Sequence, residues 1–446
     1  MRNKHIVPTL IVLIILVFSL SCSGGIGDAK DFGNPPSPGS CFCDPDGVET
    51  YLEWVWGEYP QFTNLRNIGS SEDGRPIYVI ELSDSPSYSE EEPAVLINGA
   101  IHGDEQLSAG ICLKLIEHLL TAYDYYLNPD PDQTIFSEAE VEQAGYLIEN
   151  FKIHILPAIN PDGLASGERL NSNYVDLNRN FGYNWDESEF NNGEAAFDQA
   201  ESAAVRDDFT EEGYSLAINL HTAAYTSNIG IYAPWDAIDS TTSDFIETYL
   251  PNYQIIKTIG SSYADTVSNN NPYPFNNYFH YEEGGDWYLM NGSMADWAMG
   301  TSGAVSYTIE LYGAQNFTTD DSYLLDETWS SHKAAMLELI KKAELGSGGI
   351  IIDSNLSPVE DAVISLDYTG AASRAFIAKE YNKLAGNSAK DGSFRFLTGE
   401  GLYHITISKN GYQSVEMDVE VNSTGLTRTK DSLSYEFFPD YTLPKL

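Results

Sequence analysis

The sequence contains few cationic residues. Only 23 of its 446 residues are Lys or Arg, against 66 Asp and Glu, which gives a formal net charge of -43 at pH 7. A protein with this charge repels phosphate backbones and anionic lipid surfaces. We therefore expect no nucleic-acid partner, and we interpret the charge as a soluble, strongly hydrated surface.

The apolar run at the amino terminus is short. It spans residues 6–20 and follows Arg2 and Lys4. Because it is too short and too terminal for a transmembrane helix, we expect residues 1–22 to be a secretory signal. Ser21 and Cys22 resemble a bacterial lipoprotein cleavage site with lipid on Cys22, although Ser19 stands where such sites usually carry leucine. A plain signal peptide is the alternative.

The mature protein is accordingly expected outside the cytoplasm, as a cell-envelope lipoprotein or a secreted protein. Its only expected membrane contact is the lipid anchor on Cys22. Residues 23–45 are rich in Gly, Pro, Ser and Asp, a composition typical of a flexible tether. Export permits a disulfide, but the scarce thiols of Cys41, Cys43 and Cys112 do not define a pairing. Cys112 is most simply a core residue.

The rest of the chain divides into two unequal parts. In residues 46–345 short apolar strands alternate with helical stretches, which predicts an α/β domain with a mixed, largely parallel sheet flanked by helices. The predicted strands are 94–97, 152–159, 215–220 and 304–311, and the predicted helices are 107–120 and 332–343.

Residues 347–440 differ in character from the preceding part. Short strands and turn signals such as Asp391-Gly392 and Asn410-Gly411 predict a small antiparallel β-sandwich. The region has no obvious cluster of reactive groups, so we expect no chemistry there. The predicted strands are 349–352, 362–366, 393–396, 403–407 and 415–421.

Two of the eight histidines follow predicted strands of the larger part. His102, with Glu105 three residues later, comes after strand 94–97, and His221 follows strand 215–220. Functional groups of an open parallel sheet collect at the carboxyl ends of its strands. Two imidazoles and one carboxylate make a three-ligand zinc site with a fourth position open. Each motif alone is weak, because such residues also occur as surface polarity or as core histidines.

Further polar residues strengthen this hypothesis. Arg169 and Arg179 lie close together in a chain with few cations, and a guanidinium matches a carboxylate or a developing oxyanion. Either arginine could instead pair with one of the many acids. Glu310 stands within an otherwise apolar strand, where an acid is costly unless it is paired, metal-bound or required. Beside a metal it would suit a general base.

The order of these motifs resembles the zinc carboxypeptidase family of the carboxypeptidase A and B type. The resemblance spans most of residues 46–343 and includes segment 68–77. It rests on His102-Gly-Asp-Glu105, Asn160-Pro-Asp-Gly, Arg169, Asn178-Arg179-Asn180, His221, Asp296-Trp297 and Glu310 in a Tyr-Thr-Ile-Glu-Leu strand.

The resemblance implies a role for each matching residue. His102, Glu105 and His221 would hold one Zn²⁺ ion, and Glu310 would be the base and proton shuttle. Arg169 would stabilise the oxyanion. Asn178 and Arg179 would hold the carboxylate of a peptide or protein C-terminus. The enzyme would then be a metallocarboxypeptidase that hydrolyses the last peptide bond with metal-activated water.

Two assignments are less direct. The mobile tyrosine of the family falls best on Tyr288, although Tyr281 and Tyr278 lie in the same loop. Asp236 resembles the acid with which the carboxypeptidase N and E branch recognises C-terminal Lys or Arg, which implies a preference for basic C-termini. Asp236 could instead be a loop aspartate, and the pocket could accept apolar residues.

The region after residue 347 resembles the transthyretin-like domain that follows the catalytic domain in the N and E branch. Two other functions stay open. The chain could be a carboxypeptidase for cell-wall peptides with diaminopimelate or a D-amino acid, or a module that binds C-termini without cutting. A serine hydrolase is disfavoured because the sequence contains no Gly-x-Ser-x-Gly.

Overall fold

A computed structural model describes residues 36–86, 88, 92–129, 135–223, 228–234, 253–270, 279–312, 322–368, 383–399, 401–421 and 441–443. The expected signal segment and Cys22 lie outside these ranges, as does Asp236. Among the described residues, no helix combines the length and the apolar character needed to span a bilayer.

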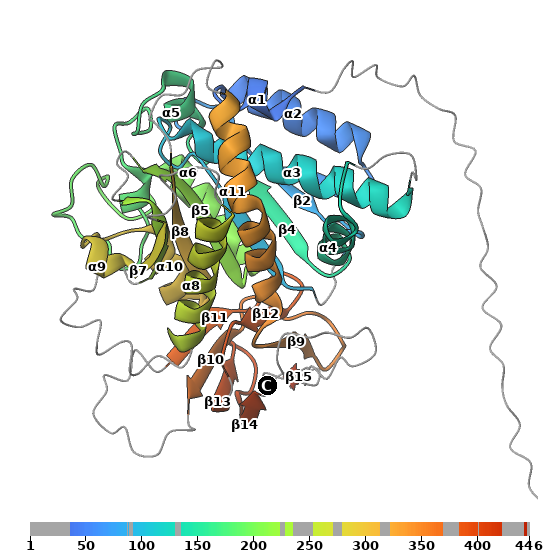
Figure 1. Ribbon diagram of the computed structural model, residues 1–446. Coiled ribbons are helices and arrows are strands. Elements are labelled where there is room, and N and C mark those ends of the chain that lie inside the picture. The colour runs from blue at the N-terminus through green and yellow to red at the C-terminus, as the bar shows by residue number, and fades with distance from the viewer. Residues whose placement is uncertain are drawn as a thin grey trace, which may run out of the picture. The chain divides into compact units, whose positions relative to one another are not determined.

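An eight-stranded sheet forms the centre of the larger part (Figure 1). Its order is β1-β2-β4-β3-β5-β8-β6-β7, and β4, β3, β5 and β8 run parallel to one another. The prediction of a mixed, largely parallel sheet is therefore confirmed. The strands are β1 (Thr63–Ser70), β2 (Pro76–Leu82), β3 (Ala94–Asn98), β4 (Lys152–Leu156), β5 (Leu216–Ala223), β6 (Gly230–Ala233), β7 (His280–Glu283) and β8 (Val305–Tyr312).

Helices cover both faces of this sheet, so the central strands β3 and β5 are buried along their whole length. On one face α3 contacts α4 and α11 (Figure 1), while α6 contacts β1. The described helices are α1 (Pro38–Cys41), α2 (Pro45–Glu58), α3 (Gln106–Leu127), α4 (Glu138–Ile148), α5 (Pro161–Ser166), α6 (Ala200–Glu212), α8 (Tyr253–Asn269), α9 (Gly284–Trp287), α10 (Met294–Trp297) and α11 (Ser322–Lys341), with the shorter turns η1 (Leu177–Arg179), η4 (Ala298–Ser302) and η6 (Lys342–Glu344).

The ends of two helices follow from local sequence. Ser137 and Glu140 form a reciprocal capping box that starts α4, and Gly213 ends α6 in the left-handed conformation. Helix α3 is mostly buried, and Cys112 within it is fully buried, as expected for a core residue. Helix α1 and the buried Phe42 lie inside the range whose composition predicts a tether.

The carboxyl-terminal part contains two small sheets. One has the order β11-β10-β13-β14 with antiparallel neighbours, and the other has the order β12-β9-β15. One pairing differs from the expected antiparallel arrangement, since β15 runs parallel to β9. The strands are β9 (Ser347–Asp353), β10 (Val363–Tyr368), β11 (Lys383–Asn387), β12 (Ser393–Phe396), β13 (Gly401–Ser408), β14 (Val415–Val421) and β15 (Tyr441–Leu443).

Candidate metal centre and active site

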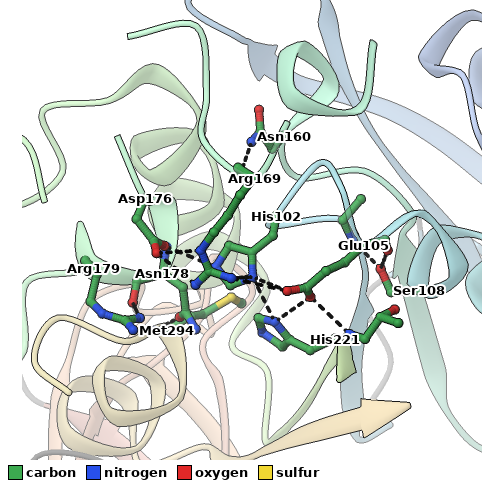
Figure 2. Close-up of polar contacts among 12 residues, drawn as sticks. His102, Glu105, Ser108, Asn160, Arg169, Asp176, Asn178, Arg179, His221 and Met294 are labelled. Atoms are coloured by element: carbon green, nitrogen blue, oxygen red, sulfur yellow. Dashed lines mark hydrogen bonds and ion pairs between the residues drawn. The ribbon is translucent and has the colours of Figure 1, made fainter. Parts of the chain in front are cut away.

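The structure brings His102, Glu105 and His221 together. Their ligand atoms all lie within 4.8 Å of one another, and the three residues are buried. His102 and Glu105 lie between β3 and α3, and His221 lies in β5, the neighbour of β3. Figure 2 shows the three side chains pointing toward one another. Two segments far apart in sequence thus meet at the carboxyl ends of adjacent parallel strands.

The distances between these side chains are short. His102 Nδ1 lies 2.8 Å from one carboxylate oxygen of Glu105, and His221 Nδ1 lies 2.9 Å from the other. The two Nδ1 atoms are 3.2 Å apart. Three electron-pair donors therefore converge on one point, which is the arrangement that a divalent cation requires.

Backbone contacts fix the loop that carries His102 and Glu105. Ser108 in the first turn of α3 donates to the Glu105 carbonyl at 2.6 Å and accepts from the Ala100 amide at 2.8 Å. Gly103 passes so close to Gly163 that a Cβ on it would lie 1.9 Å from that residue's backbone. Only glycine fits at position 103, so the loop conformation depends on this close approach.

Asp176 is a site residue to which the sequence analysis assigned no role. One of its carboxylate oxygens lies 3.1 Å from His102 Nε2, and the other accepts from Arg169 Nη2 at 2.9 Å (Figure 2). It orients the imidazole of a metal-ligand candidate, as outer carboxylates do in metal sites. Its position two residues before Asn178 was visible in the sequence, but nothing distinguished it from the other acids.

Glu310 lies opposite His221 in the neighbouring strand β8. Opposed residues of adjacent strands present their side chains on the same face. Only 7% of its surface is exposed. Burial raises the pKa of Glu310 to about 8, an effect that the nearby Glu105 carboxylate reinforces and His221 opposes. The protein therefore places a proton-accepting group of raised basicity beside the donor set.

The other carboxylates of the site stay ionised. Burial works against the charge, but His102 and His221 lower the pKa of Glu105. Asp176 is likewise buried, yet His102 and Arg169 hold its pKa well below the usual value. Burial also disfavours the charged form of His102, whose pKa is nevertheless raised by Glu105 and Asp176. The site thus favours positive charge at its centre, whether that charge is a proton or a cation.

Arg169, Asn178 and Arg179 line up next to this group. Arg169 Nη1 lies 3.1 Å from His102 Nδ1 and 3.3 Å from a Glu105 carboxylate oxygen. The Asn178 carbonyl accepts from Arg179 Nη1 at 2.9 Å, and its side-chain oxygen accepts from the Met294 amide at 2.9 Å. The turn η1 therefore carries a side-chain amide and a guanidinium on consecutive residues (Figure 2).

Tyr288 is the tyrosine that reaches this cluster. Burial raises the pKa of the Tyr288 hydroxyl, while the nearby positive charge of Arg179 opposes this shift; the ring of Tyr288 packs edge-on against Trp287 with the ring centroids 4.4 Å apart. Tyr281 instead packs against Gly260 of α8 and donates to Glu283. Tyr278 and Asp236 lie outside the described residues.

Three comparisons with known proteins agree with this geometry. The sequence profile of the family described as "Zinc carboxypeptidase" matches residues 48–335. Human carboxypeptidase D is 28% identical over 408 residues, which cover 87% of this chain and 26% of that protein. The chain thus spans about a quarter of that relative. Mouse carboxypeptidase M is 26% identical over 393 residues, which cover 83% of this chain and 78% of carboxypeptidase M.

Solved structures show the same fold. The carboxypeptidase A from Helicoverpa armigera matches with a TM-score of 0.50 and 22% identity, and the match covers 67% of this chain and 73% of that one. Thrombin activatable fibrinolysis inhibitor matches with a TM-score of 0.53 and 19% identity, over 67% of this chain and 74% of that one. At these identities the likeness concerns the fold of the larger part.

Proposed function

The chain belongs to the zinc carboxypeptidase family, and from this membership we propose that it is a zinc-dependent exopeptidase that hydrolyses the C-terminal bond of peptides or proteins. The observation that carries this proposal is the buried group of His102, Glu105 and His221 with Glu310 opposite His221 in the next strand. Their chemistry suits zinc, which accepts imidazole nitrogen and carboxylate oxygen. A bound zinc ion supplies Lewis-acid polarisation of the scissile carbonyl and lowers the pKa of water.

Glu310 acts as the general base in this proposal. It removes the proton from the attacking water and delivers it to the amine of the departing residue. Its burial supports the second step, because a carboxyl group of raised pKa holds the proton until it is delivered. Arg169 lies next to Glu105 and His102 and donates to the carbonyl oxygen as negative charge develops there.

Asn178, Arg179 and Tyr288 hold the end of the substrate. A guanidinium and a side-chain amide on consecutive residues of η1 can bind both oxygens of a free carboxylate. Tyr288 donates a hydrogen bond from the open side, where 40% of its surface is exposed. Fixing the chain end in this way places the last peptide bond at the metal, which makes the enzyme an exopeptidase.

The test uses peptides that end in Lys, Arg, Leu, Phe or Glu, together with one cell-wall peptide that contains diaminopimelate. We expect release of the last residue only, lost with a zinc chelator. The variant Glu310→Gln should lower kcat roughly 10²–10⁴-fold while it keeps the zinc content of the wild type. Release from the cell-wall peptide alone would favour the cell-wall alternative, and binding without release would favour the binding module.

The side-chain preference is a separate proposal. Asp236 selects C-terminal Lys or Arg, because a carboxylate in the pocket forms a charge-assisted hydrogen bond with a cationic side chain. The high negative charge of the chain supports an attraction for such substrates. If Asp236→Ala leaves the ratio of Arg to Leu release unchanged, Asp236 does not set the preference.

Location and domain division are also proposals. The composition of residues 1–22 supports export, and Cys22 supports a lipid anchor. Fractionation of cells that express wild type or Cys22→Ser tests the anchor. If Cys22 carries the lipid, the variant should be released from the membrane fraction. The β-rich segment 347–440, which we liken to a transthyretin-like domain, follows the catalytic domain at 46–345, and we expect it to carry no chemistry.

A further inference from the structure

Two motifs of the family resemblance have no role in the proposed chemistry. They are Asn160-Pro-Asp-Gly, which begins α5, and segment 68–77, which contains the turn between β1 and β2. The side chain of Asp162 joins the two motifs, and only 4% of this residue is exposed. A buried carboxylate is costly unless it is paired, so the partners of Asp162 indicate what it does.

The hydrogen-bond partners that the structure describes for Asp162 are all donors. Its Oδ1 accepts from Ser71 Oγ and from Arg75 Nη1, at 2.7 Å each. Its Oδ2 accepts from the Asp73 amide at 3.0 Å and from Ser172 Oγ at 3.1 Å. Burial opposes the negative charge, but these hydrogen bonds lower the pKa of Asp162. The ionised carboxylate therefore ties the β1–β2 turn to α5 and to Ser172.

Arg169 lies between the two segments that Asp162 holds. It follows α5 and precedes Ser172 by three residues. Its backbone carbonyl accepts from the Asn160 side chain at 3.3 Å (Figure 2) and from the Gly103 amide at the same distance. Gly103 belongs to the loop of the metal-ligand candidates. The backbone of Arg169 is therefore fixed by the start of α5 and by that loop together.

The contact between α5 and this loop leaves no free space. A Cβ on Gly103 would lie 1.9 Å from the carbonyl carbon of Gly163, the residue that follows Asp162. The Gly163 carbonyl also accepts from the Glu168 amide at 3.0 Å, directly before Arg169. Because closely packed backbone segments transmit strain, a displacement of Asp162 affects both the loop and the segment of Arg169.

We propose that Asp162, held by Ser71 and Arg75, is a positioning residue that sets the place of the Arg169 guanidinium. Negative charge on the carbonyl oxygen develops only in the transition state, and donors must lie about 2.7–3.1 Å from it. A displaced guanidinium therefore lowers kcat and leaves the binding of substrate unchanged. This inference rests on the proposed function and adds to it a set of residues remote from the substrate on which the rate depends.

Asp162→Asn is the main variant. Asn has nearly the same shape, but its amide nitrogen is a donor and would face one of the donors that surround Asp162. Arg75→Ala is the milder variant, because the Arg75 side chain is 38% exposed and the contacts of Asp162 with Ser71, Asp73 and Ser172 remain.

Asp208→Asn is the matched control. Asp208 is 5% exposed, and it likewise accepts from an arginine, Arg66, at 2.7 Å and from a hydroxyl group, that of Tyr214, at 2.8 Å. Its partners lie outside segment 160–172. It therefore reproduces the loss of a buried, arginine-paired carboxylate without disturbing the segment of Arg169.

The experiment measures kcat, KM, zinc content and Tm, together with two competitive inhibitors. One is the free amino acid that the enzyme releases, which binds through its carboxylate. The other is a peptide in which a phosphonate replaces the scissile bond, because its tetrahedral anion resembles the transition state.

Asp162→Asn should lower kcat roughly 10-fold and weaken the phosphonate by about the same factor. KM, zinc content and inhibition by the amino acid should stay at the wild-type values. Arg75→Ala should change kcat in the same direction, by about 3-fold. Asp208→Asn should lower the Tm as Asp162→Asn does, but should keep kcat and both inhibition constants.

Two results would overturn the inference alone. If Asp162→Asn loses Tm as the control does but keeps kcat, Asp162 only stabilises the fold. If it raises KM or loses zinc while kcat is kept, the network positions groups other than Arg169. Should Asp162→Asn fail to fold, Arg75→Ala decides, since an unchanged kcat in that variant contradicts the inference. Failure of the wild type to cleave any peptide would refute the proposed function itself.

Discussion

Two clusters of this protein share arginine, histidine and carboxylate side chains. The Arg169 cluster consists of His102, Glu105, Arg169, Asp176 and His221. The Arg66 cluster consists of Arg66, His154, Asp208, Glu212 and Tyr214. Each combines an arginine, histidine and two carboxylates, yet only the first holds a group of metal-ligand geometry among the residues that the structure describes.

The difference lies in how the carboxylates are used. In the Arg66 cluster Asp208 accepts from Arg66 at 2.7 Å and from the Tyr214 hydroxyl at 2.8 Å. Burial, with the positive charges of Arg66 and Lys152, lowers the pKa of His154 well below its usual value. The imidazole of His154 is therefore neutral, and the positive charge of Arg66 is paired with Asp208 and Glu212. The Arg66 cluster is therefore a structural network in which the arginine pairs with the acids.

Position in the strand separates the two histidines. His154 lies in the middle of β4, whereas His102 follows β3 and His221 lies near the end of β5. Groups at the carboxyl ends of parallel strands can meet in a crevice, while a residue in the middle of a strand is covered by helices on either face. A reactive site thus needs ligand atoms that converge at the ends of neighbouring strands, and residue types alone do not make one.

The sharpest test of this comparison removes a histidine from each cluster. His221→Ala should abolish stoichiometric zinc binding and lower kcat/KM by roughly 10³-fold or more, because metal catalysis supplies several kcal/mol of transition-state stabilisation. His154→Ala should keep the zinc and the activity but destabilise the fold by about 2 kcal/mol through a buried cavity. Metal analysis and denaturant unfolding measure both. Loss of zinc from His154→Ala would show that the clusters are coupled.

The carboxylates offer a smaller, parallel test. Asp176→Asn should lower zinc affinity and kcat roughly 10–100-fold, because the residue orients His102. Asp208→Asn should cost about 1–3 kcal/mol of stability, since it removes a charged partner of Arg66, with kcat unchanged. Zinc competition titrations and urea unfolding distinguish the two. Equal effects of both variants on zinc affinity would erase the contrast.

The smallest expected effect concerns Glu212. Burial raises its pKa to about 7, although Arg66 opposes this shift. The folded value exceeds that of the unfolded chain, so the stabilising contribution of the protonated form is lost as the pH rises through about 7. Because the loss begins at the unfolded value of about 4.5, Glu212→Gln should match the wild-type Tm at pH 4 and exceed it at pH 8 by roughly 1–3 °C. A lower Tm at pH 8 would show that the ion pair with Arg66 outweighs burial.

Much of the larger part could be predicted from sequence. The predicted strands 94–97, 215–220 and 304–311 agree with β3, β5 and β8 within a few residues, because buried parallel strands are continuous apolar runs. Strand 152–159 ends earlier, at Leu156. Edge strands such as β1 and β7 were not predicted, since their polar residues lack the apolar signal of buried strands.

The sequence by itself determined the central strands, the acidic character and the family, which the profile match confirms. It also indicated which residues could bind a metal, because polar residues that directly follow an apolar run lie at the end of a strand. Only the tertiary structure decided that Asp176 joins His102 to Arg169, that Tyr288 lies near Arg179 whereas Tyr281 donates to Glu283, and that His154 lies beside Arg66. These contacts join residues by chain folding and not by spacing, so a local pattern carries no record of them.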